Sequence, residues 1–346
     1  MNLLNFILEK IIQTMEKIRW GILGCGRIAS KFSEDLLLVE NAVLEAVASR
    51  DVQRAKSLAE KNKIKKYYSN YEELASDPHI DIIYIATPHG LHYEHAMLCL
   101  DHGKAVLCEK AFALNSKQAE AMVEKARVQN IFLMEALWSK FLPHYRLLMH
   151  YIKDGRMGTL QNVLINFGFA VGNDPVSRIY EPTLGGGSLL DIGIYNVFFA
   201  LSALGEPDEI QAWMTPAPTG VDAQCAVTFR YNNGSFAQLF SSFTSHLPTE
   251  AVFSGTGGSV RLSTRFYEPS TTFEYYPDKM QSKEIIPFER TAGWGYHYEI
   301  RHVNECLLQG RKESPVMRTE DTLLLMRVMD RIRKKAGIIY AADGNL

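Results

Sequence analysis

The sequence predicts an α/β protein of two domains: an N-terminal doubly wound parallel sheet, then an α+β domain with a large, open and mostly antiparallel sheet. Three observations lead to this prediction. The chain has 346 residues, and about 150 residues per domain gives two domains. Apolar runs alternate with helical patterns as far as residue 137, and a region rich in strand patterns and turn signals follows. We therefore divide the chain into residues 1–14, 15–137 and 138–346.

Residues 15–137 carry five apolar runs separated by helical patterns. A run without polar positions, such as IIYIA at 82–86, is typical of a strand buried on both faces of a parallel sheet. Regular alternation of strand and helix over the whole segment indicates a doubly wound sheet. The expected strands are Ile18–Leu23, Val43–Ser49, Asp81–Ala86, Ala105–Glu109 and Ile131–Glu135. The expected helices are Ile28–Leu38, Val52–Asn62, Leu91–Leu100 and Lys117–Gln129.

The pattern changes after Trp138. The pair Asn233-Gly234 lies between two apolar runs and is a strong signal of a hairpin, which joins antiparallel strands. The expected strands are Leu160–Val171, Glu209–Trp213, Ala223–Tyr231, Ser235–Phe243, Ala251–Ser254, Ser259–Leu262 and Thr271–Tyr276. The expected helices are Leu142–Asp154, Ser188–Leu204 and Glu320–Lys335.

The first fourteen residues stand apart from this pattern. Apolar side chains recur with helical spacing in MNLLNFILEKIIQT, whereas a compact strand pattern starts directly after Met15. A signal peptide would need a basic start and a small-residue cleavage site, and both are missing. Two interpretations stay open: a short amphipathic helix docked on the body of the protein, or an upstream start codon read in place of the one at Met15. We favour the second.

Composition narrows the class of function. Lys+Arg 37 against Asp+Glu 39 gives a net charge of −2, so we expect no nucleic-acid partner, which usually needs a basic patch. No run of about 18 apolar residues occurs, so we expect neither a membrane span nor a membrane partner. Five cysteines without a CxxC pair argue against a disulfide framework or zinc ribbon and fit a reducing cytoplasm. A cytoplasmic enzyme is therefore expected.

A glycine pattern follows the first expected strand. Residues 24–29 read GCGRIA, the G-x-G-x-x-G/A pattern of dinucleotide-binding turns, and they open a helix as that mechanism requires. Gly24 permits a tight turn, Gly26 lets the backbone approach a pyrophosphate, and Ala29 allows close packing of helix and strand. The first helical N–H groups, at Arg27 and Ile28, would face the phosphates. The sequence therefore predicts a nicotinamide dinucleotide site.

The end of the second expected strand bears on the choice of coenzyme. An NAD enzyme usually places an acid here, about 20 residues past the glycines, to hold the ribose 2′-hydroxyl. This chain instead has Ser49 and Arg50, with Arg54 one helical turn later. A 2′-phosphate needs hydroxyls and cations, so we predict NADP(H) over NAD(H). The alternative is that both arginines are solvated and that Asp51 is the helix cap or the ribose acid.

A third segment, TPHGLHYEHA at 87–96, follows another buried strand and begins with Thr87 at the sheet edge where ligands bind. His89, His92 and His95 recur at three-residue steps, which suggests a metal. Such steps at a loop-to-helix junction do not bring three imidazoles into one tetrahedron, and no thiolate or carboxylate cluster is near. We expect no metal, and one histidine facing the cofactor.

The acid/base chemistry is expected from two further places. Glu109 and Lys110 close a buried strand, which puts a lysine where a substrate would bind. The GGGS stretch at 185–188 opens the long helix that carries Asp191 and Tyr195, and their i, i+4 spacing sets both on one face with Gly193 between them. An ammonium near a phenol lowers the phenol's pKa, so Lys110 and Tyr195 would form an acid/base pair.

Five segments together resemble the Gfo/Idh/MocA family, the group of glucose–fructose oxidoreductase and inositol dehydrogenase. These segments are the fingerprint at Gly24, TPHGLHYEHA, CEKA at 108–111, EALWSKFLPHY at 135–145 and GGGSLLDIGIY at 185–195. Within the family, the chain is most similar to the branch of dimeric dihydrodiol dehydrogenase and NADP-dependent D-xylose 1-dehydrogenase. The resemblance covers nearly everything from Met15 onward.

The resemblance, joined to the reading above, implies three sets of site residues. The catalytic set is Lys110, Tyr195 as the acid/base, and Asp191. The cofactor set is Gly24, Gly26, Arg27, Ile28, Ser49, Arg50, Arg54, Thr87, His92, Glu109 and Lys110. The aromatic substrate wall is Trp138, Phe167 and Trp294. The family also implies a sugar or diol substrate, and a homodimer formed through the open sheet.

One position departs from the family, because Ala111 stands where proline usually follows the lysine. The peptide bond after Lys110 is then either trans, which moves the lysine slightly, or held cis by the fold. We expect hydride transfer between nicotinamide C4 and a hydroxyl-bearing carbon, with Tyr195 exchanging the hydroxyl proton. A dehydrogenase of another polyol, such as an inositol, and a cofactor-binding sensor without turnover stay open as alternatives.

Overall fold

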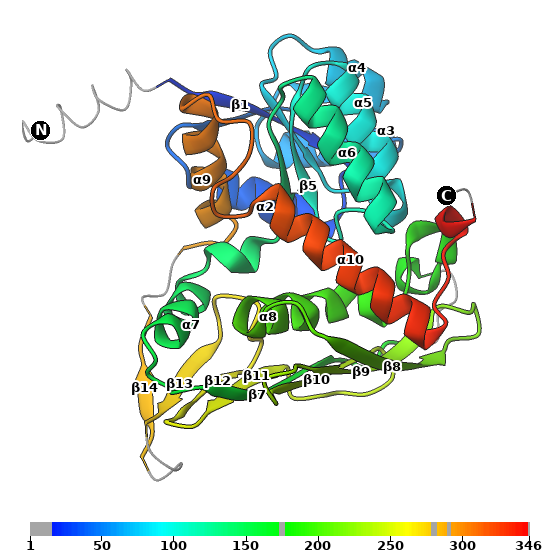
Figure 1. The fold of residues 1–346 in the computed structure, drawn as a ribbon. Coiled ribbons are helices and arrows are strands. Elements are labelled where there is room, and N and C mark those ends of the chain that lie inside the picture. Colours follow the sequence, from blue (N-terminus) through cyan, green and yellow to red (C-terminus); the bar gives the residue numbers. More distant parts are fainter. Residues whose placement is uncertain (1–15, 173–176, 278–281, 289–291, 345–346) are drawn as a thin grey trace, which may run out of the picture.

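The computed structural model describes residues 16–172, 177–277, 282–288 and 292–344. The expected segment 1–14 lies outside the described residues. The fold class expected from the sequence is confirmed: Figure 1 shows a parallel sheet wrapped by helices above a second, broad sheet. Three helices, α7 (Pro143–Lys153), α8 (Ile194–Leu204) and α10 (Thr319–Ala336), lie between the two sheets (Figure 1).

The N-terminal sheet has six parallel strands in the order β3-β2-β1-β4-β5-β6. The order reverses between β1 and β4, which is the place where such sheets bind ligands. The strands are β1 (Ile18–Leu23), β2 (Ala42–Ala48), β3 (Lys66–Tyr68), β4 (Ile82–Ile85), β5 (Ala105–Glu109) and β6 (Leu133–Ala136). The helices are α2 (Arg27–Leu36), α3 (Val52–Lys61), α4 (Tyr71–Ser76), α5 (His92–Asp101) and α6 (Ser116–Val128).

Strand β4 shows why this sheet is parallel and covered on both faces. All four of its residues are buried. Tyr84 points to one face, where its ring stacks on Phe32 of α2 with 3.6 Å between centroids. Ile83 and Ile85 belong to a separate core on the opposite face, formed with α5 and α6. Two cores on one strand leave no polar position in it, as the apolar run predicts.

Four elements were not expected from the sequence. Strand β3 and helix α4 are too short to show a period, and β14 (Glu284–Ile286) has only three residues. Helix α9 (His297–Leu308) carries polar residues on much of its surface, so its periodic signal is weak. Tertiary contacts stabilise such elements more than their own propensity does.

The C-terminal sheet has eight strands in the order β14-β13-β12-β11-β7-β10-β9-β8. Its strand pairs are antiparallel apart from β7 with β10. The hairpin at Asn233-Gly234 joins β9 and β10, as expected. The remaining strands are β7 (Leu160–Gly168), β8 (Glu209–Pro216), β9 (Asp222–Arg230), β10 (Phe236–Ser242), β11 (Glu250–Gly255), β12 (Ser259–Ser263) and β13 (Thr272–Tyr276).

The expected helix 188–204 is a π-helical turn, Leu189–Gly193, followed by α8. Asp222 of β9 holds its start, because its Oδ2 accepts hydrogen bonds from the Ser188 hydroxyl (2.9 Å) and the Leu189 N–H (2.6 Å). Burial raises the pKa of Asp222 to about 6. A π turn widens the helix and is frequent at functional sites. Here it carries Asp191.

By length and composition, one helical stretch among the described residues, Pro182–Leu204, could cross a membrane. Its mean hydropathy is 1.5, but 78% of the window is buried inside the protein. The stretch packs against β7 and β10 and against α10. Burial of this kind is typical of the core helix of a globular domain.

Candidate active site

A cavity of about 750 Å³ lies between the two domains, beside the carboxyl ends of β1, β2, β4 and β5. It brings together nearly all of the expected site residues. Those that line it are Gly24, Gly26, Arg27, Ile28, Ser49, Arg50, Arg54, Thr87, Glu109, Lys110, Trp138, Phe167, Asp191, Tyr195 and Trp294. The cavity is therefore a single site with a glycine turn at one end and a lysine, an aspartate and a tyrosine at the other.

The glycine turn fits a dinucleotide. Gly24 has a φ of +97°, which favours glycine, and a Cβ there would lie 2.9 Å from Thr87 Cγ2. A Cβ on Gly26 would meet nothing within 4 Å. Helix α2 begins at Arg27, so its first N–H groups lack helical partners. Open space above a glycine at a helix N-terminus is the cradle that a pyrophosphate needs.

The end of β2 is arranged around Asp51. Its Oδ1 accepts the N–H groups of Gln53 (3.0 Å) and Arg54 (3.3 Å), so it caps α3, as the alternative interpretation expected. Its Oδ2 pairs with Arg54 Nε at 3.2 Å, and the Asp51 N–H donates to Ser49 Oγ at 3.2 Å. Arg50 and Arg54 are exposed at the cavity. Asp51 is therefore a helix cap with two cations beside it, and the choice of NADP(H) over NAD(H) stays a prediction.

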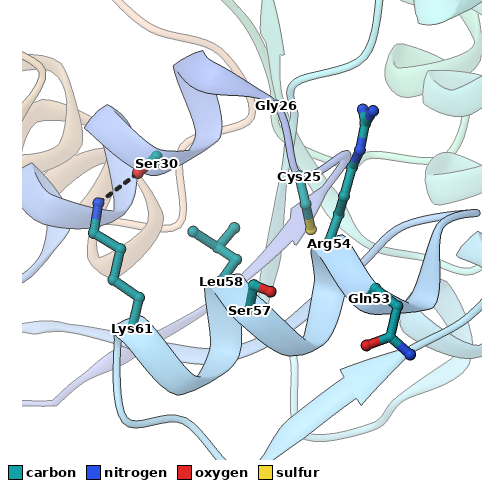
Figure 2. A pocket seen from close by; sticks show the side chains of 8 residues that line it. All are labelled: Cys25, Gly26, Ser30, Gln53, Arg54, Ser57, Leu58 and Lys61. Atoms are coloured by element: carbon teal, nitrogen blue, oxygen red, sulfur yellow. Dashed lines mark hydrogen bonds between the residues drawn. The ribbon is translucent and has the colours of Figure 1, made fainter.

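A smaller pocket of about 350 Å³ adjoins this end between α2 and α3 (Figure 2). It shares Cys25, Gly26 and Arg54 with the main cavity. Lys61 closes its far end by donating to Ser30 Oγ at 2.7 Å and to Glu34 at 2.6 Å. Its lining is Cys25, Gly26, Ser30, Gln53, Arg54, Ser57, Leu58 and Lys61.

Lys110 and Asp191 meet at the opposite end of the main cavity. The Lys110 ammonium donates to the Asp191 carbonyl oxygen (2.7 Å) and lies 3.6 Å from its carboxylate. Arg178 lies 3.5 Å, and His89 Nε2 3.7 Å, from the same carboxylate oxygen. Burial alone would raise the pKa of Asp191, but the charges of Lys110 and Arg178 hold it below its usual value. The carboxylate therefore stays ionised and fixes the lysine.

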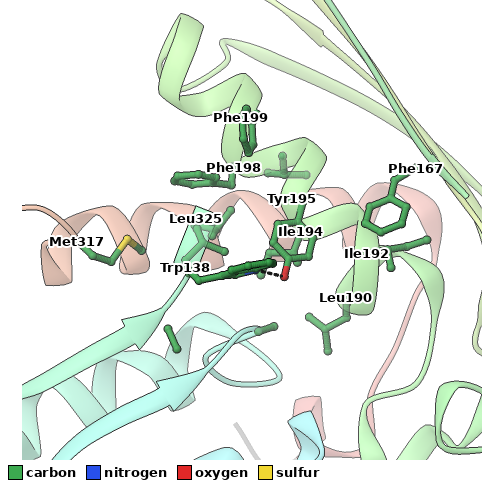
Figure 3. Close-up of a cluster of buried hydrophobic side chains, with 14 of the residues drawn as sticks. Trp138, Phe167, Leu190, Ile192, Ile194, Tyr195, Phe198, Phe199, Met317 and Leu325 are labelled. Carbon is green, nitrogen blue, oxygen red and sulfur yellow. Dashed lines mark hydrogen bonds between the residues drawn. The ribbon is translucent and has the colours of Figure 1, made fainter. Parts of the chain in front are cut away.

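Tyr195 lies beside this pair and is nearly buried. Its hydroxyl accepts a hydrogen bond from the indole N–H of Trp138 (2.9 Å), shown in Figure 3, and Lys110 Nζ lies 5.0 Å from its ring centroid. The expected lowering of its pKa is wrong for this geometry. Burial, and next the carboxylate of Glu109, raise the pKa of Tyr195 well above its ordinary value. The phenol is therefore protonated at neutral pH.

Aromatic rings form the wall beside Tyr195. Trp138 stacks on Tyr296 with 4.4 Å between centroids, and Phe167 stacks on Tyr267 at 4.5 Å. Tyr267 also lies 4.9 Å from the ring of Tyr195. Trp138 and Phe167 are thus where the resemblance places them. Tyr267 and Tyr296, which also line the cavity, were not expected, because nothing in the sequence spacing links them to the site.

Trp294 lines the cavity beside α2, whereas His92 does not line it. The indole N–H of Trp294 donates to Glu34 of α2 (2.7 Å) and Lys31 lies 4.0 Å from its ring, so Trp294 lies against α2. His92 is buried beneath the cavity, with its ring nitrogens 2.7 Å from the carbonyl oxygens of Thr87 and Ala111.

His89, three residues earlier, lines the cavity in place of His92. Its Nδ1 contacts the Gly185 carbonyl oxygen at 3.1 Å, and burial lowers its pKa to about 3. The peptide bond between Lys110 and Ala111 is cis, the second of the two geometries left open above. Across the described ranges, no group of three or more histidines, cysteines or acids could hold a metal ion.

Comparison with known proteins agrees with this geometry. A family model described as an oxidoreductase family with an NAD-binding Rossmann fold matches residues 18–136, and a model of the C-terminal domain of the same family matches residues 145–261. The chain belongs to the Gfo/Idh/MocA family. It is an NAD(P)-binding oxidoreductase of this family, and its curated relatives are named as dehydrogenases.

Two of these relatives are trans-1,2-dihydrobenzene-1,2-diol dehydrogenases. The one from Sus scrofa is 37% identical over 334 residues, covering 94% of this chain and 99% of the relative. The one from Mus musculus is 37% identical over 335 residues with the same coverage. The similarity to these two relatives therefore extends over almost the whole of this chain.

Solved structures with the same fold include several sugar enzymes. The aldose-aldose oxidoreductase from Caulobacter crescentus, complexed with glycerol, has a TM-score of 0.85 at 24% identity and covers 93% of this chain and 98% of its own. A 3-ketoreductase from Actinomadura kijaniata, complexed with NADP and TDP-benzene, has a TM-score of 0.83 at 25% identity with the same coverage. A levoglucosan dehydrogenase, solved with NADH and levoglucosan, has a TM-score of 0.82 at 20% identity and covers 93% of this chain and 98% of its own. Proteins with this fold have thus been solved with either coenzyme.

Proposed function

We propose that this oxidoreductase is an NADP(H)-dependent dehydrogenase of a cyclic diol or a sugar, with Tyr195 as the acid/base and Lys110 assisting it. The observation that carries the proposal is one cavity with the glycine turn at one end and Lys110, Asp191 and Tyr195 at the other. The diol is put first because the relatives at 37% identity are named for one. The aromatic wall suits a flat, partly unsaturated ring.

In the proposed reaction, different residues of the chain bind the coenzyme, orient the substrate and exchange the proton. A bound nicotinamide would supply the hydride chemistry. The turn at Gly24 and Gly26 and the first turn of α2 would bind its pyrophosphate. Lys110, held by Asp191, orients and polarises the substrate oxygen, while the Tyr195 hydroxyl exchanges a proton with it. The rings of Trp138 and Phe167 exclude water from this end.

The raised pKa of Tyr195 predicts opposite pH profiles for the two directions. A protonated phenol donates to a carbonyl oxygen, so kcat for reduction should be constant near neutrality and fall at high pH. Oxidation needs the phenolate, whose fraction grows with pH, so kcat for oxidation should rise from about pH 7 to about pH 10. Initial rates in both directions measure this. An oxidation rate that falls across this range would contradict the assignment.

A substrate panel tests the proposal directly. Absorbance of NADPH is followed with trans-dihydrodiols, aldoses, keto-sugars and inositols, with NADH in parallel. We expect turnover with a dihydrodiol or an aldose. Faster turnover of an inositol would favour the alternative polyol dehydrogenase. Tight coenzyme binding without turnover of any compound would favour a sensor.

We also propose that two copies associate through the outer face of the eight-stranded sheet and that the protein works in the cytoplasm; neither a nucleic acid nor a membrane is part of the proposal. Four large apolar side chains are exposed on this sheet: Trp213 (61%), Ile285 (57%), Leu164 (43%) and Phe236 (42%). Exposed apolar groups gathered on one face mark an interaction surface. All five cysteines are free, as a reducing compartment favours.

The dimer has a simple test. Sedimentation equilibrium should give twice the mass of one chain, and the pair of changes Trp213→Glu and Leu164→Arg should give one chain's mass, because charges would be buried in the interface. Glu305→Arg, on exposed α9, serves as the control and should leave the mass unchanged. A monomeric unmodified protein at micromolar concentration would refute the proposal.

A further inference from the structure

A buried carboxylate at the end of α2 organises a turn that lines the cavity. Asp35 is fully buried, and its two oxygens accept the backbone N–H groups of Trp294, Gly295 and Tyr296, each at 2.7 Å. The N–H of His297, where α9 begins, adds a longer contact of 3.3 Å. Burial would raise the pKa of Asp35, but the imidazole of His297, 3.5 Å away, and these backbone hydrogen bonds keep it below its usual value. The charge is thus held by backbone donors 260 residues away in sequence.

The turn at 293–296 is built for this carboxylate. Gly293 has a φ of +80°, and a Cβ there would lie 2.1 Å from Asp35 Oδ1, so only glycine fits. Trp294 is fastened to the same helix by its hydrogen bond to Glu34 and by Lys31 over its ring. Helix α2 therefore holds this turn through several side chains along its length.

The 293–296 turn supports Tyr195 through two aromatic side chains. The ring of Tyr296 stacks on Trp138 at an interplanar angle of 15° and also lies 6.1 Å from Phe32 of α2. Trp138 donates its indole N–H to the Tyr195 hydroxyl. Each link is a direct contact, so an unbroken path runs from Asp35 through Tyr296 and Trp138 to the oxygen of Tyr195.

We propose that Asp35 is a positioning residue for Tyr195, acting through the 293–296 turn, the ring of Tyr296 and the indole N–H of Trp138. The inference rests on the proposed function, in which Tyr195 exchanges the proton. It assigns α2 two tasks: its first turn faces the coenzyme pyrophosphate, and its last turn fixes the hydrogen bond that aims the phenol. A lost turn would leave the glycine cradle intact and disturb the hydrogen bond that aims the phenol.

The first test does not depend on activity. The protein has four tryptophans, so ¹⁵N-labelled indole N–H groups give four NMR signals, and Trp138→Phe identifies the signal of Trp138. In Asp35→Asn, an amide N–H₂ group replaces one carboxylate oxygen and faces backbone N–H groups, so hydrogen bonds that the carboxylate accepted are lost. We expect the Trp138 signal to shift and its proton to exchange faster with solvent, whereas the signal of Trp213, on strand β8 of the far sheet, stays in place. An unmoved Trp138 signal overturns the proposal.

The control for this test is Asp81→Asn. Asp81 also accepts a backbone N–H in the same domain, from Arg19 at 2.8 Å, and does not line the cavity. Its variant should leave the Trp138 signal unmoved. If Asp35→Asn does not fold, Tyr296→Leu tests the next link, and an unchanged Trp138 signal in that variant likewise overturns the path.

The second test uses kinetics. Asp35→Asn and Trp138→Phe should each lower kcat by about tenfold to a hundredfold, as a misaimed group does, with the Kd for NADPH within about threefold. The double variant should be no slower than the slower single variant, because both changes break one path. Effects that multiply, or a loss confined to coenzyme binding, overturn the proposal. If no substrate is found, the proposed function fails and the NMR test still decides this inference.

Discussion

Replacing Tyr195 with phenylalanine is expected to lower kcat by about a hundredfold to ten-thousandfold, the usual contribution of a positioned general acid or base. The phenol oxygen is the atom that Trp138 holds at 2.9 Å, and Lys110 lies over the same ring. Phenylalanine keeps the ring and its packing, so coenzyme affinity should change by less than about twofold. Steady-state rates with a turned-over diol or sugar, and fluorescence titration with NADPH, measure the two effects.

Tyr145→Phe is the matched control for this change. Tyr145 on α7 is also nearly buried, donates its hydroxyl to Ser202 Oγ at 2.9 Å, and does not line the cavity. This change also removes a buried phenol oxygen, but one away from the cavity, so kcat should be unchanged. A Tyr195→Phe enzyme with undiminished turnover would show that another group exchanges the proton.

The joint change of Arg50 and Arg54 to alanine is expected to weaken NADP(H) binding by about a hundredfold, because each charge-assisted hydrogen bond to a phosphate contributes about 1.5–3 kcal/mol at best and both are exposed. Affinity for NAD(H), which has no 2′-phosphate, should change by less than about threefold. Fluorescence titration of the four coenzyme forms measures both. Arg54 would exchange its partner Asp51 for the phosphate.

Arg127→Ala provides the control for the loss of a cation. Arg127 on α6 is exposed, pairs with Glu124 at 3.3 Å and does not line the cavity, so its variant should bind both coenzymes as before. Equal affinity of the unmodified protein for NADP(H) and NAD(H) would contradict the assignment. In that case Asp51, now seen to cap α3, becomes the ribose acid of the alternative reading.

Much of the first domain could be predicted because local signals and global fold agree there. Strands β1 and β5 begin and end at the expected residues, since their runs are mostly apolar and are flanked by glycine or charge. The cavity end of β5 was found from one anomaly, a Glu-Lys pair after a buried run. By contrast, β3 has three residues and no period, and it exists because it pairs with β2.

The errors in the site have a common cause. His89 and His92 lie on the same short segment, and spacing cannot say which side chain faces the cavity; burial of His92 between two carbonyl groups decides it. The pKa of Tyr195 depends on how deeply the phenol is buried and on its distance from Glu109, and neither quantity is written in a spacing.

The sequence by itself determined the α/β fold class and the dinucleotide turn at Gly24, because each rests on residues close together along the chain; Lys110 and Tyr195 as the reacting groups remain a prediction. Only the tertiary structure decided how those groups act together. Asp35, Tyr296, Trp138 and Tyr195 come from four separate segments, and their contacts form only when the two domains pack. Contacts between distant segments depend on three-dimensional packing, which the local periodicity of a sequence does not encode.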